Sequence, residues 1–185
     1  MSVRVVPWSP QWRVEFERVA DDLRTALATV PRARVEHVGS TSVPGLAAKP
    51  ILDIDVIVPR ADVGAAVAAL VKVGYVHRGD LGVADREAFH PPDDAPARHV
   101  YVCVEDTVNV RNHLAVRDTL RRDAALRDAY AEVKLALAEH PGMDIDTYIA
   151  RKSGVLQRAL EASGEFTATE LRAIRRLNDP EDSLG

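Results

Sequence analysis

The sequence predicts an α+β fold: a small mixed β-sheet with flanking helices and a C-terminal helical region. Two segments, residues 51–58 and 98–104, alternate with the period of a β-strand. An amphipathic helix precedes them, and helical periodicity dominates the sequence after residue 110. The 185 residues suffice for one ordinary domain with a buried core. We expect this domain to span residues 1–164, with a C-terminal helix and polar tail over residues 165–185.

The first predicted elements are a helix and a short strand. Ser9 and Pro10 are typical of a helix N-terminus, with serine as the N-cap and proline at the first helical position. Apolar residues then recur at helical spacing: Trp12, Phe16, Val19, Leu23 and Leu27. Pro31 ends this helix. A strand over residues 33–38 follows and runs into Gly39-Ser40.

The two main strands each have two unlike faces, because neighbouring side chains of a strand point to opposite sides. In residues 51–58, Asp53 and Asp55 share one face and the other face is purely aliphatic. Residues 98–104 repeat this design, with valines on one face. The polar positions of their other face are His99 and Tyr101.

The remaining elements connect and follow these strands. A helix is expected between an Asp62 N-cap and a closing Gly74. A short strand over residues 75–77 follows it. Residues 79–97 are rich in turn-forming residues and predict a surface excursion around a brief strand at 86–89. Four further helices are predicted, over residues 110–122, 124–139, 144–162 and 167–177.

Composition excludes several classes of protein. The net charge of −4 and the pI near 5.9 argue against binding of nucleic acid by bulk electrostatics, which needs a basic face. Cys103 is the only cysteine, so neither an intrachain disulfide nor a cysteine-based zinc site can form. The first ten residues lack the profile of a signal peptide, and no stretch has the length of a membrane span. We therefore expect a cytoplasmic protein without membrane contact.

Asp53 and Asp55 are the strongest candidates for a metal site. Two residues apart on one strand, they lie roughly 6.6 Å apart along it and can reach the same cation. Carboxylate oxygens are preferred ligands of Mg²⁺, which usually fills its other positions with water and substrate phosphates. The alternative is an acid pair that simply faces solvent at a sheet edge, but a strand gains no evident stability from two acids in register.

The turn Gly39-Ser40-Thr41-Ser42 is a candidate phosphate site. It follows a strand and offers backbone N–H groups and three hydroxyls. Such turns are abundant, and an ordinary turn is the alternative interpretation. The spacing adds to the case, since an Asp-x-Asp strand follows the Gly-Ser turn after a dozen residues.

This arrangement resembles the signature of the nucleotidyltransferase superfamily, in which Gly-Ser holds nucleotide phosphates and Asp-x-Asp holds magnesium. Over a longer stretch, residues 36–55 are similar to the central motif of the GrpB family and read EHVGSTSVPGLAAKPILDID. The resemblance extends to about residue 162. Its further matches are residues 7–12, 98–102, 111–114 and 117–118, and the pairs Tyr130 with Lys134 and Tyr148 with Lys152.

One departure from active nucleotidyltransferases concerns the third acid that usually completes their metal site. On the neighbouring strand this chain has His99 and Tyr101 instead. His99 could serve as a metal ligand or a proton acceptor, or pack the pocket wall. Glu105, at the end of the same strand, could replace the missing acid.

Several basic residues are candidates for binding phosphates. Lys49 could meet a phosphate or neutralise Asp53. Arg111, His113 and Arg117 cluster on one helix and could bind a triphosphate, although a solvated helix is the alternative. Tyr148 and Lys152 are implied by the resemblance to contact the nucleotide, and the alternative for Lys152 is a lysine whose stem covers apolar surface.

Together these residues predict magnesium-dependent nucleotidyl transfer from ATP or another nucleoside triphosphate to a small-molecule or protein acceptor. Asp53, Asp55 and His99 are the catalytic candidates. A second hypothesis is a nucleotide-binding or accessory module of the kind that the resemblance associates with dephospho-CoA kinases. A third is ATP-dependent ligation or phosphoryl transfer on the same metal platform.

Overall fold

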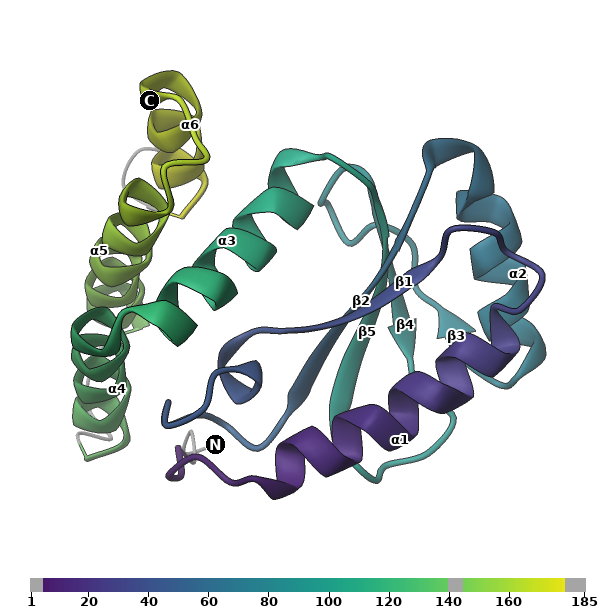
Figure 1. Ribbon diagram of the computed structural model, residues 1–185, viewed down its shortest axis with the longest axis horizontal. Coiled ribbons are helices and arrows are strands. Elements are labelled where there is room, and N and C mark those ends of the chain that lie inside the picture. Colours follow the sequence, from purple (N-terminus) through teal and green to yellow (C-terminus); the bar gives the residue numbers. More distant parts are fainter. Residues whose placement is uncertain (1–4, 140–144, 179–185) are drawn as a thin grey trace.

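A five-stranded mixed sheet forms the centre of the protein (Figure 1). The computed structural model describes residues 5–139 and 145–178, with side chains over residues 5–136 and 152–176. Strand order is β1-β2-β5-β4-β3; β2 and β5 are parallel and the other neighbours are antiparallel. The strands are β1 (Arg34–Val38), β2 (Leu52–Val58), β3 (Val76–His77), β4 (Arg86–His90) and β5 (Arg98–Val104).

The helices lie on both faces of the sheet and beyond one side of it. They are α1 (Gln11–Ala26), α2 (Val63–Lys72), α3 (Val108–Arg122), α4 (Ala124–Glu139), α5 (Ile145–Ser163) and α6 (Ala168–Asn178). Two short 3₁₀ turns, η1 (Ser40–Ser42) and η2 (Arg60–Asp62), follow β1 and β2. None of the described helices is both long and apolar enough to cross a membrane.

The main core lies between the sheet and the helices α1 and α2. On β2, the aliphatic face predicted from the sequence is buried there completely. We call this surface the dry face of the sheet; its residues on the two central strands are Leu52, Ile54, Val56, Val58, Val100 and Val102. The helices cover it with large apolar side chains, among them Trp12, Phe16, Leu23 and Leu70. Burial of these side chains is the main source of stability.

The opposite surface, which we call the polar face, carries Asp53, Asp55, His99 and Tyr101. Helix α3 crosses it and packs Val110 and Leu114 on Ile57 and Cys103. Burial and the adjacent Asp55 carboxylate raise the pKa of the Cys103 thiol.

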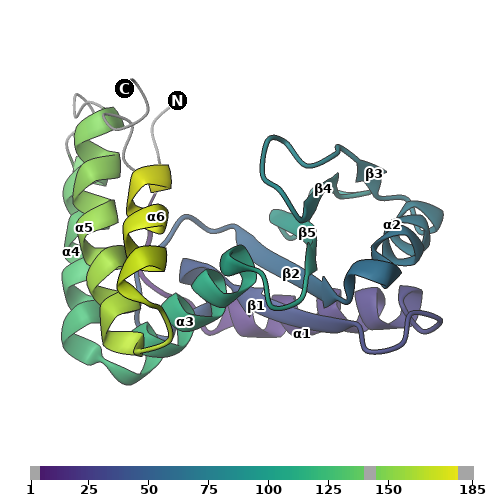
Figure 2. The same cartoon turned by 90° about the horizontal axis from the view of Figure 1, so that it is seen from above.

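Helices α4, α5 and α6 form a group beside the sheet, joined to it through α3 (Figure 2). Val43 and Leu46, which lie between η1 and β2, pack on Tyr130 of α4 and Val155 of α5. Ile174 of α6 packs on Ala115 and Leu160. The helical group therefore has apolar contacts both with α3 and with the segment that follows the Gly-Ser turn.

One polar side chain, His37 of β1, lies on the α1 side. Its ring stacks on Phe16 with centroids 4.5 Å apart, and its Nε2 lies 3.0 Å from the Thr41 hydroxyl. Burial, together with the charge of Arg121, lowers the pKa of His37 to about 4. The ring is therefore neutral in the folded protein at pH 7.

The structure confirms the predicted fold class and the predicted order of strands and helices. One prediction about a helix N-terminus is confirmed and one is wrong. Pro10, just before the first assigned residue of α1, Gln11, already has a helical backbone, and Ser9 accepts a hydrogen bond from the Gln11 N–H as an N-cap serine does. The Asp62 side chain makes no capping hydrogen bond, because this residue ends a 3₁₀ turn with a helical backbone and an N-cap needs an extended one.

Candidate functional site

The carboxylates of Asp53 and Asp55 lie on the polar face, and each contacts a histidine. Asp55 is fully buried, and its Oδ2 lies 2.7 Å from Nδ1 of His113 on α3. The side chain of Asp53 is 36% exposed, and its Oδ1 lies 3.0 Å from Nδ1 of His99. The parallel register of β2 and β5 explains the second contact, since it places His99 directly opposite Asp53.

These contacts raise the pKa of both histidines. For His99 the hydrogen bond to Asp53 is the largest cause. For His113 burial acts to lower the pKa, but the hydrogen bond to Asp55 and the charges of both carboxylates outweigh it. Each histidine therefore gains affinity for a proton from the carboxylate beside it.

The other carboxylate oxygen of Asp55 is also buried. Its Oδ1 has no nitrogen or oxygen partner within the described part of the chain. A buried carboxylate oxygen normally accepts hydrogen bonds or binds a cation, because an unsatisfied one costs free energy. This oxygen therefore marks a position where a ligand would restore a lost interaction.

The Gly-Ser turn is packed against Asp53. Antiparallel pairing of β1 with β2 sets Val38 opposite Asp53. Gly39, the next residue, therefore lies beside the Asp53 carboxylate. Gly39 has φ +68°, and a Cβ on it would lie 2.2 Å from Oδ2 of Asp53. Only glycine combines this backbone conformation with so close an approach.

The three hydroxyls of the turn have different roles in the structure. Thr41 donates to the carbonyl of Ile51 at 3.2 Å, and Ser42 donates to the carbonyl of Gly39 at 2.6 Å. Both hydroxyls thus hold the turn in shape. The hydroxyl of Ser40 instead accepts a hydrogen bond from the Lys134 amine of α4.

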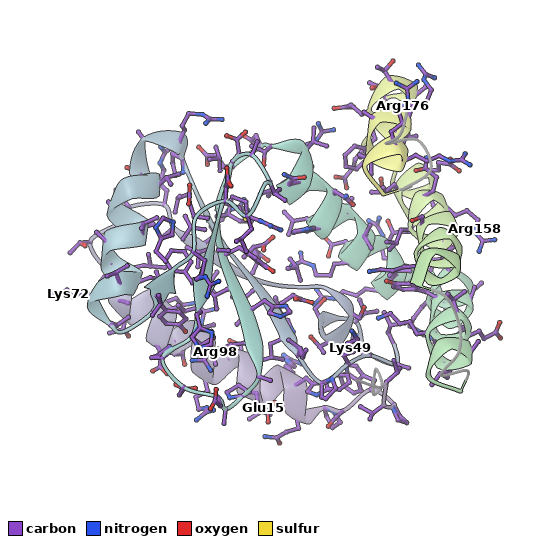
Figure 3. All side chains as sticks on the ribbon, turned by 180° about the vertical axis from the view of Figure 1, so that it is seen from behind. Glu15, Lys49, Lys72, Arg98, Arg158 and Arg176 are labelled. Atoms are coloured by element: carbon purple, nitrogen blue, oxygen red, sulfur yellow. The ribbon has the colours of Figure 1, made fainter. Side chains whose placement is uncertain are left out.

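Two neighbouring cavities open between the sheet and the helical group. The first, of about 170 Å³, is lined by Val5, Ser40, Thr41, Lys49, Ile51, Asp53, His99, Tyr130, Lys134 and Lys152. The second, of about 270 Å³, lies on the α3 side and shares four of these residues: Ser40, Asp53, Tyr130 and Lys152. Asn112, His113 and Arg117 also line it. Figure 3 shows Lys49 on the side of the sheet that faces α4 and α5, away from Lys72 and Arg98.

Lys134 has an unusual environment for a lysine. The residue is 6% exposed, and its Nζ lies 4.7 Å from the centroid of the Tyr130 ring. Burial, with a contribution from the charge of Lys152, lowers the pKa of Lys134 to about 7. Burial also lowers the pKa of Lys152. Sequence reasoning did not select Lys134 as a site residue. In the sequence it is marked only by its match to the family pattern and by its helical spacing from Tyr130.

The structure brings most of the sequence candidates together. The residues that line one or both cavities are Gly39, Ser40, Thr41, Lys49, Asp53, His99, His113 and Lys152, and Asp55 contacts His113. Ser42 lines neither cavity. The side chain of Tyr148 lies outside the described residues. Glu105, considered as a replacement for the third acid, lies one residue beyond β5 and lines neither cavity.

The two arginines of α3 differ in where they point. Arg117 lines the second cavity and also pairs with Glu36 at 2.8 Å and Asp118 at 2.7 Å. Arg111 turns to the opposite side, where it pairs with Glu170 at 2.8 Å and stacks on Phe166. It lines neither cavity. Sequence spacing alone did not distinguish the two residues.

Solved structures resemble this fold. A crystal structure of conserved protein GrpB from Enterococcus faecalis has a TM-score of 0.73 and 33% sequence identity, covering 88% of this chain and all of that one. A mutant of Cid1 poly(U) polymerase bound to MgATP has a TM-score of 0.60 at 14% identity, covering 83% of this chain and 50% of that chain. The second likeness establishes a nucleotidyltransferase-like fold.

Several proteins are similar to this chain in sequence over most of its length. A UPF0157 protein of Halalkalibacterium halodurans is 37% identical over 162 residues, covering 86% of this chain and 82% of the relative. A UPF0157 protein of Streptomyces coelicolor is 45% identical over 127 residues, covering 66% of this chain and 64% of the relative. The family described as GrpB protein matches residues 2–162. The chain therefore belongs to the GrpB family.

Proposed function

We propose that the protein binds a nucleoside triphosphate with Mg²⁺ and transfers its nucleotidyl group to a small-molecule or protein acceptor. The observation that carries the proposal is the contact between Gly39 and Asp53. It places the Gly-Ser turn, the candidate phosphate site, next to the carboxylate pair on the polar face. A cavity lined by three lysines lies beside both. Phosphates and a cation need these two kinds of group side by side.

The residues present fit a magnesium ion that is shared with a substrate. Asp53 is partly exposed at the first cavity, and the Oδ1 atom of Asp55 has no nitrogen or oxygen partner among the described residues. Mg²⁺ is usually held by one or two carboxylates, with water and substrate phosphates at its other positions. Asp53 and Asp55 would hold it, and it would supply positive charge to the reacting phosphate.

The other residues of the site bind and orient in this proposal. Ser40, Lys134, Lys152 and Lys49 hold the phosphates beyond the reacting one. His99, placed beside Asp53 and 54% exposed, accepts the proton of the acceptor hydroxyl or amine. Arg111 has no part in binding, because it is engaged by α6.

Structures of the Cid1 polymerase support the choice of ligand. These structures are described as bound to MgGTP and to MgATP. They share the fold of this chain at 16% and 14% identity. The likeness makes Mg-nucleotide the first ligand to test and leaves the acceptor open.

Nucleotide binding without transfer is the second candidate function. The observation that favours it is the register of β5, which sets His99 opposite Asp53 and Tyr101 opposite Asp55. Active nucleotidyltransferases usually have their third acid on this strand. In this alternative the site binds a nucleotide without transferring any part of it, and the nucleotide-bound form of the protein carries out the function.

The test combines binding and product analysis. Calorimetric titration with each nucleoside triphosphate, with and without Mg²⁺, should show metal-dependent binding to the wild type. The Asp53→Asn/Asp55→Asn double variant should lose the metal dependence. Failure of the wild type to bind any of the triphosphates would sink the proposal.

Once binding is established, identification of the released phosphate product distinguishes the candidate functions. Pyrophosphate release with a candidate acceptor supports nucleotidyl transfer. Orthophosphate without pyrophosphate would indicate ligation or phosphoryl transfer. Binding with neither product, across a panel of hydroxyl and amine acceptors, favours the second candidate.

A further inference from the structure

The first cavity concentrates positive charge around one buried amine. Lys134 projects from α4, and its Nζ donates to Ser40. Five other charged or titratable groups line its cavity. They are Lys49 before β2, Asp53 of β2, His99 of β5, Tyr130 of α4 and Lys152 of α5. Asp53 is the only carboxylate in this set, and it already contacts His99.

This arrangement opposes a charge on Lys134 while the cavity is free of ligand. The residue is 6% exposed, so water solvates an ammonium poorly there. Lys152 and Lys49 repel a further positive charge, and Asp53 is the one described lining group with charge of opposite sign. An uncharged amine satisfies the site, since it still makes the hydrogen bond with Ser40.

A polyphosphate reverses this balance. It brings several negative charges into a cavity with little water, where each is felt strongly. The same amine then gains from holding a proton, because every new neighbour favours the ammonium form. A group that changes its proton affinity on binding must exchange protons with the solvent when the ligand arrives.

We infer that Lys134 binds a phosphate group of a polyphosphate ligand, and that it takes up a proton when it does so. The inference rests on the proposed function for the class of ligand. It adds the uptake of a proton by Lys134 and therefore the coupling of ligand binding to pH.

The experiment titrates the full chain with sodium tripolyphosphate at pH 8, with EDTA present to remove metals. Titrations are run in buffers of different ionisation enthalpy, so that the slope of observed heat against buffer enthalpy counts protons. The wild type should take up roughly one proton per ligand, and its Kd should rise about tenfold per pH unit above pH 7. Protonation of the ligand itself cancels when variants are compared.

Lys134→Arg is the matched variant. Arginine keeps the positive charge but never loses its proton in this range. It should bind tripolyphosphate with about one proton fewer taken up than the wild type, and above pH 7 its Kd should rise about tenfold less per pH unit than that of the wild type. Lys152→Arg should retain the uptake.

Three results would overturn the inference. They are equal proton uptake by the wild type and Lys134→Arg, loss of uptake in Lys152→Arg but not in Lys134→Arg, and absence of tripolyphosphate binding to the wild type. A measurement on the wild type alone guards against a misfolded variant. Trace acetylation at a series of pH values, read by peptide mass spectrometry, should give a midpoint near neutrality for Lys134, and a midpoint in the ordinary lysine range would contradict the inference.

The two proposals can fail separately. Tripolyphosphate binding with proton uptake, together with no binding of any nucleoside triphosphate, keeps the inference and removes the proposed function. Metal-dependent nucleotide binding with equal proton uptake in the wild type and Lys134→Arg does the reverse.

Discussion

The two faces of the sheet are built from the same two strands and do opposite things. On the dry face, β2 and β5 contribute aliphatic side chains that are at most 7% exposed. On the polar face, the alternate residues of these strands are two aspartates, a histidine and a tyrosine, followed by Ile57 and Cys103 beneath α3. One residue along a strand thus separates the core from the candidate site.

The difference separates stability from ligand binding. Aliphatic burial on the dry face supplies free energy of folding without chemistry. The polar face contains the buried carboxylate of Asp55, whose Oδ1 has no nitrogen or oxygen partner among the described residues, which is a cost to the fold. Substitutions on the two faces should therefore change different quantities, and four predictions test this.

The largest effect is expected on the dry face. Ile54 is fully buried between the sheet and α1, so Ile54→Ala leaves a cavity and should lower the free energy of unfolding by roughly 2–5 kcal/mol. Chemical denaturation measures this loss, and Ile54→Val should show a smaller one. Affinity of the folded protein for Mg-nucleotide should not change. Loss of that affinity would show that the two faces are not independent.

The second effect depends on pH and concerns His37, a buried polar residue on the α1 side. Its folded-state pKa is lowered to about 4 by burial, so below pH 6.5 the unfolded chain binds a proton that the folded protein does not. Stability therefore falls as pH falls through this window. Between pH 7.5 and 5 this contribution should amount to about 2 kcal/mol.

The His37→Gln variant isolates that contribution, since glutamine keeps a polar group but does not titrate. The difference in unfolding free energy between wild type and variant, measured by denaturation at both pH values, should shift by the amount given above. An unchanged difference would mean that the buried ring is not the source of the pH dependence.

The third effect concerns ligand binding, through Gly39. In Gly39→Ala the new methyl group meets Oδ2 of Asp53, so the carboxylate must move. We expect Mg-nucleotide affinity to fall at least about tenfold, equal to about 1.4 kcal/mol. Gly45→Ala is the matched control, because Gly45 also has positive φ but its Cβ would contact Arg127 at an ordinary 3.4 Å. Equal losses in both variants would trace the effect to backbone strain alone.

The smallest effect is expected at Arg111. Its guanidinium pairs with Glu170 and lies outside both cavities, so Arg111→Gln should leave nucleotide affinity unchanged in the titration. Arg117→Gln, which alters the wall of the second cavity, is the comparison. A larger Kd for Arg111→Gln than for Arg117→Gln would mean that α6 moves away from Arg111 when the ligand binds.

Local patterns predicted the fold well because each element carries its own periodicity. The strand ends at Arg98 and Val104 agree with the alternation of valines, and the bounds of α4 agree with its apolar spacing. The sequence also placed Asp53 and His99 on one face of neighbouring strands. It did not specify which residues would lie opposite each other, and the register that pairs Asp53 with His99 is a finding of the structure.

Long-range contacts could not be read from local patterns. Helical spacing placed His113 and Arg117 on one face of α3 but did not say that His113 would meet Asp55. Nor did it show that Arg111 would turn to α6, which depends on how α6 packs. The contact of Lys134 with Ser40 depends on where α4 lies relative to the sheet, and no periodicity specifies that position.

That contact joins residues 94 positions apart in the chain, and it bears on how the protein is made. A nascent chain carries Asp53 and Asp55 long before it carries Lys134 and Lys152. Parallel pairing of β2 with β5 has to wait for the second strand, as do all non-local contacts of this kind. The acidic half of the site therefore exists first on the ribosome. A polyphosphate can stabilise the protein only after α4 and α5 have been synthesised and docked.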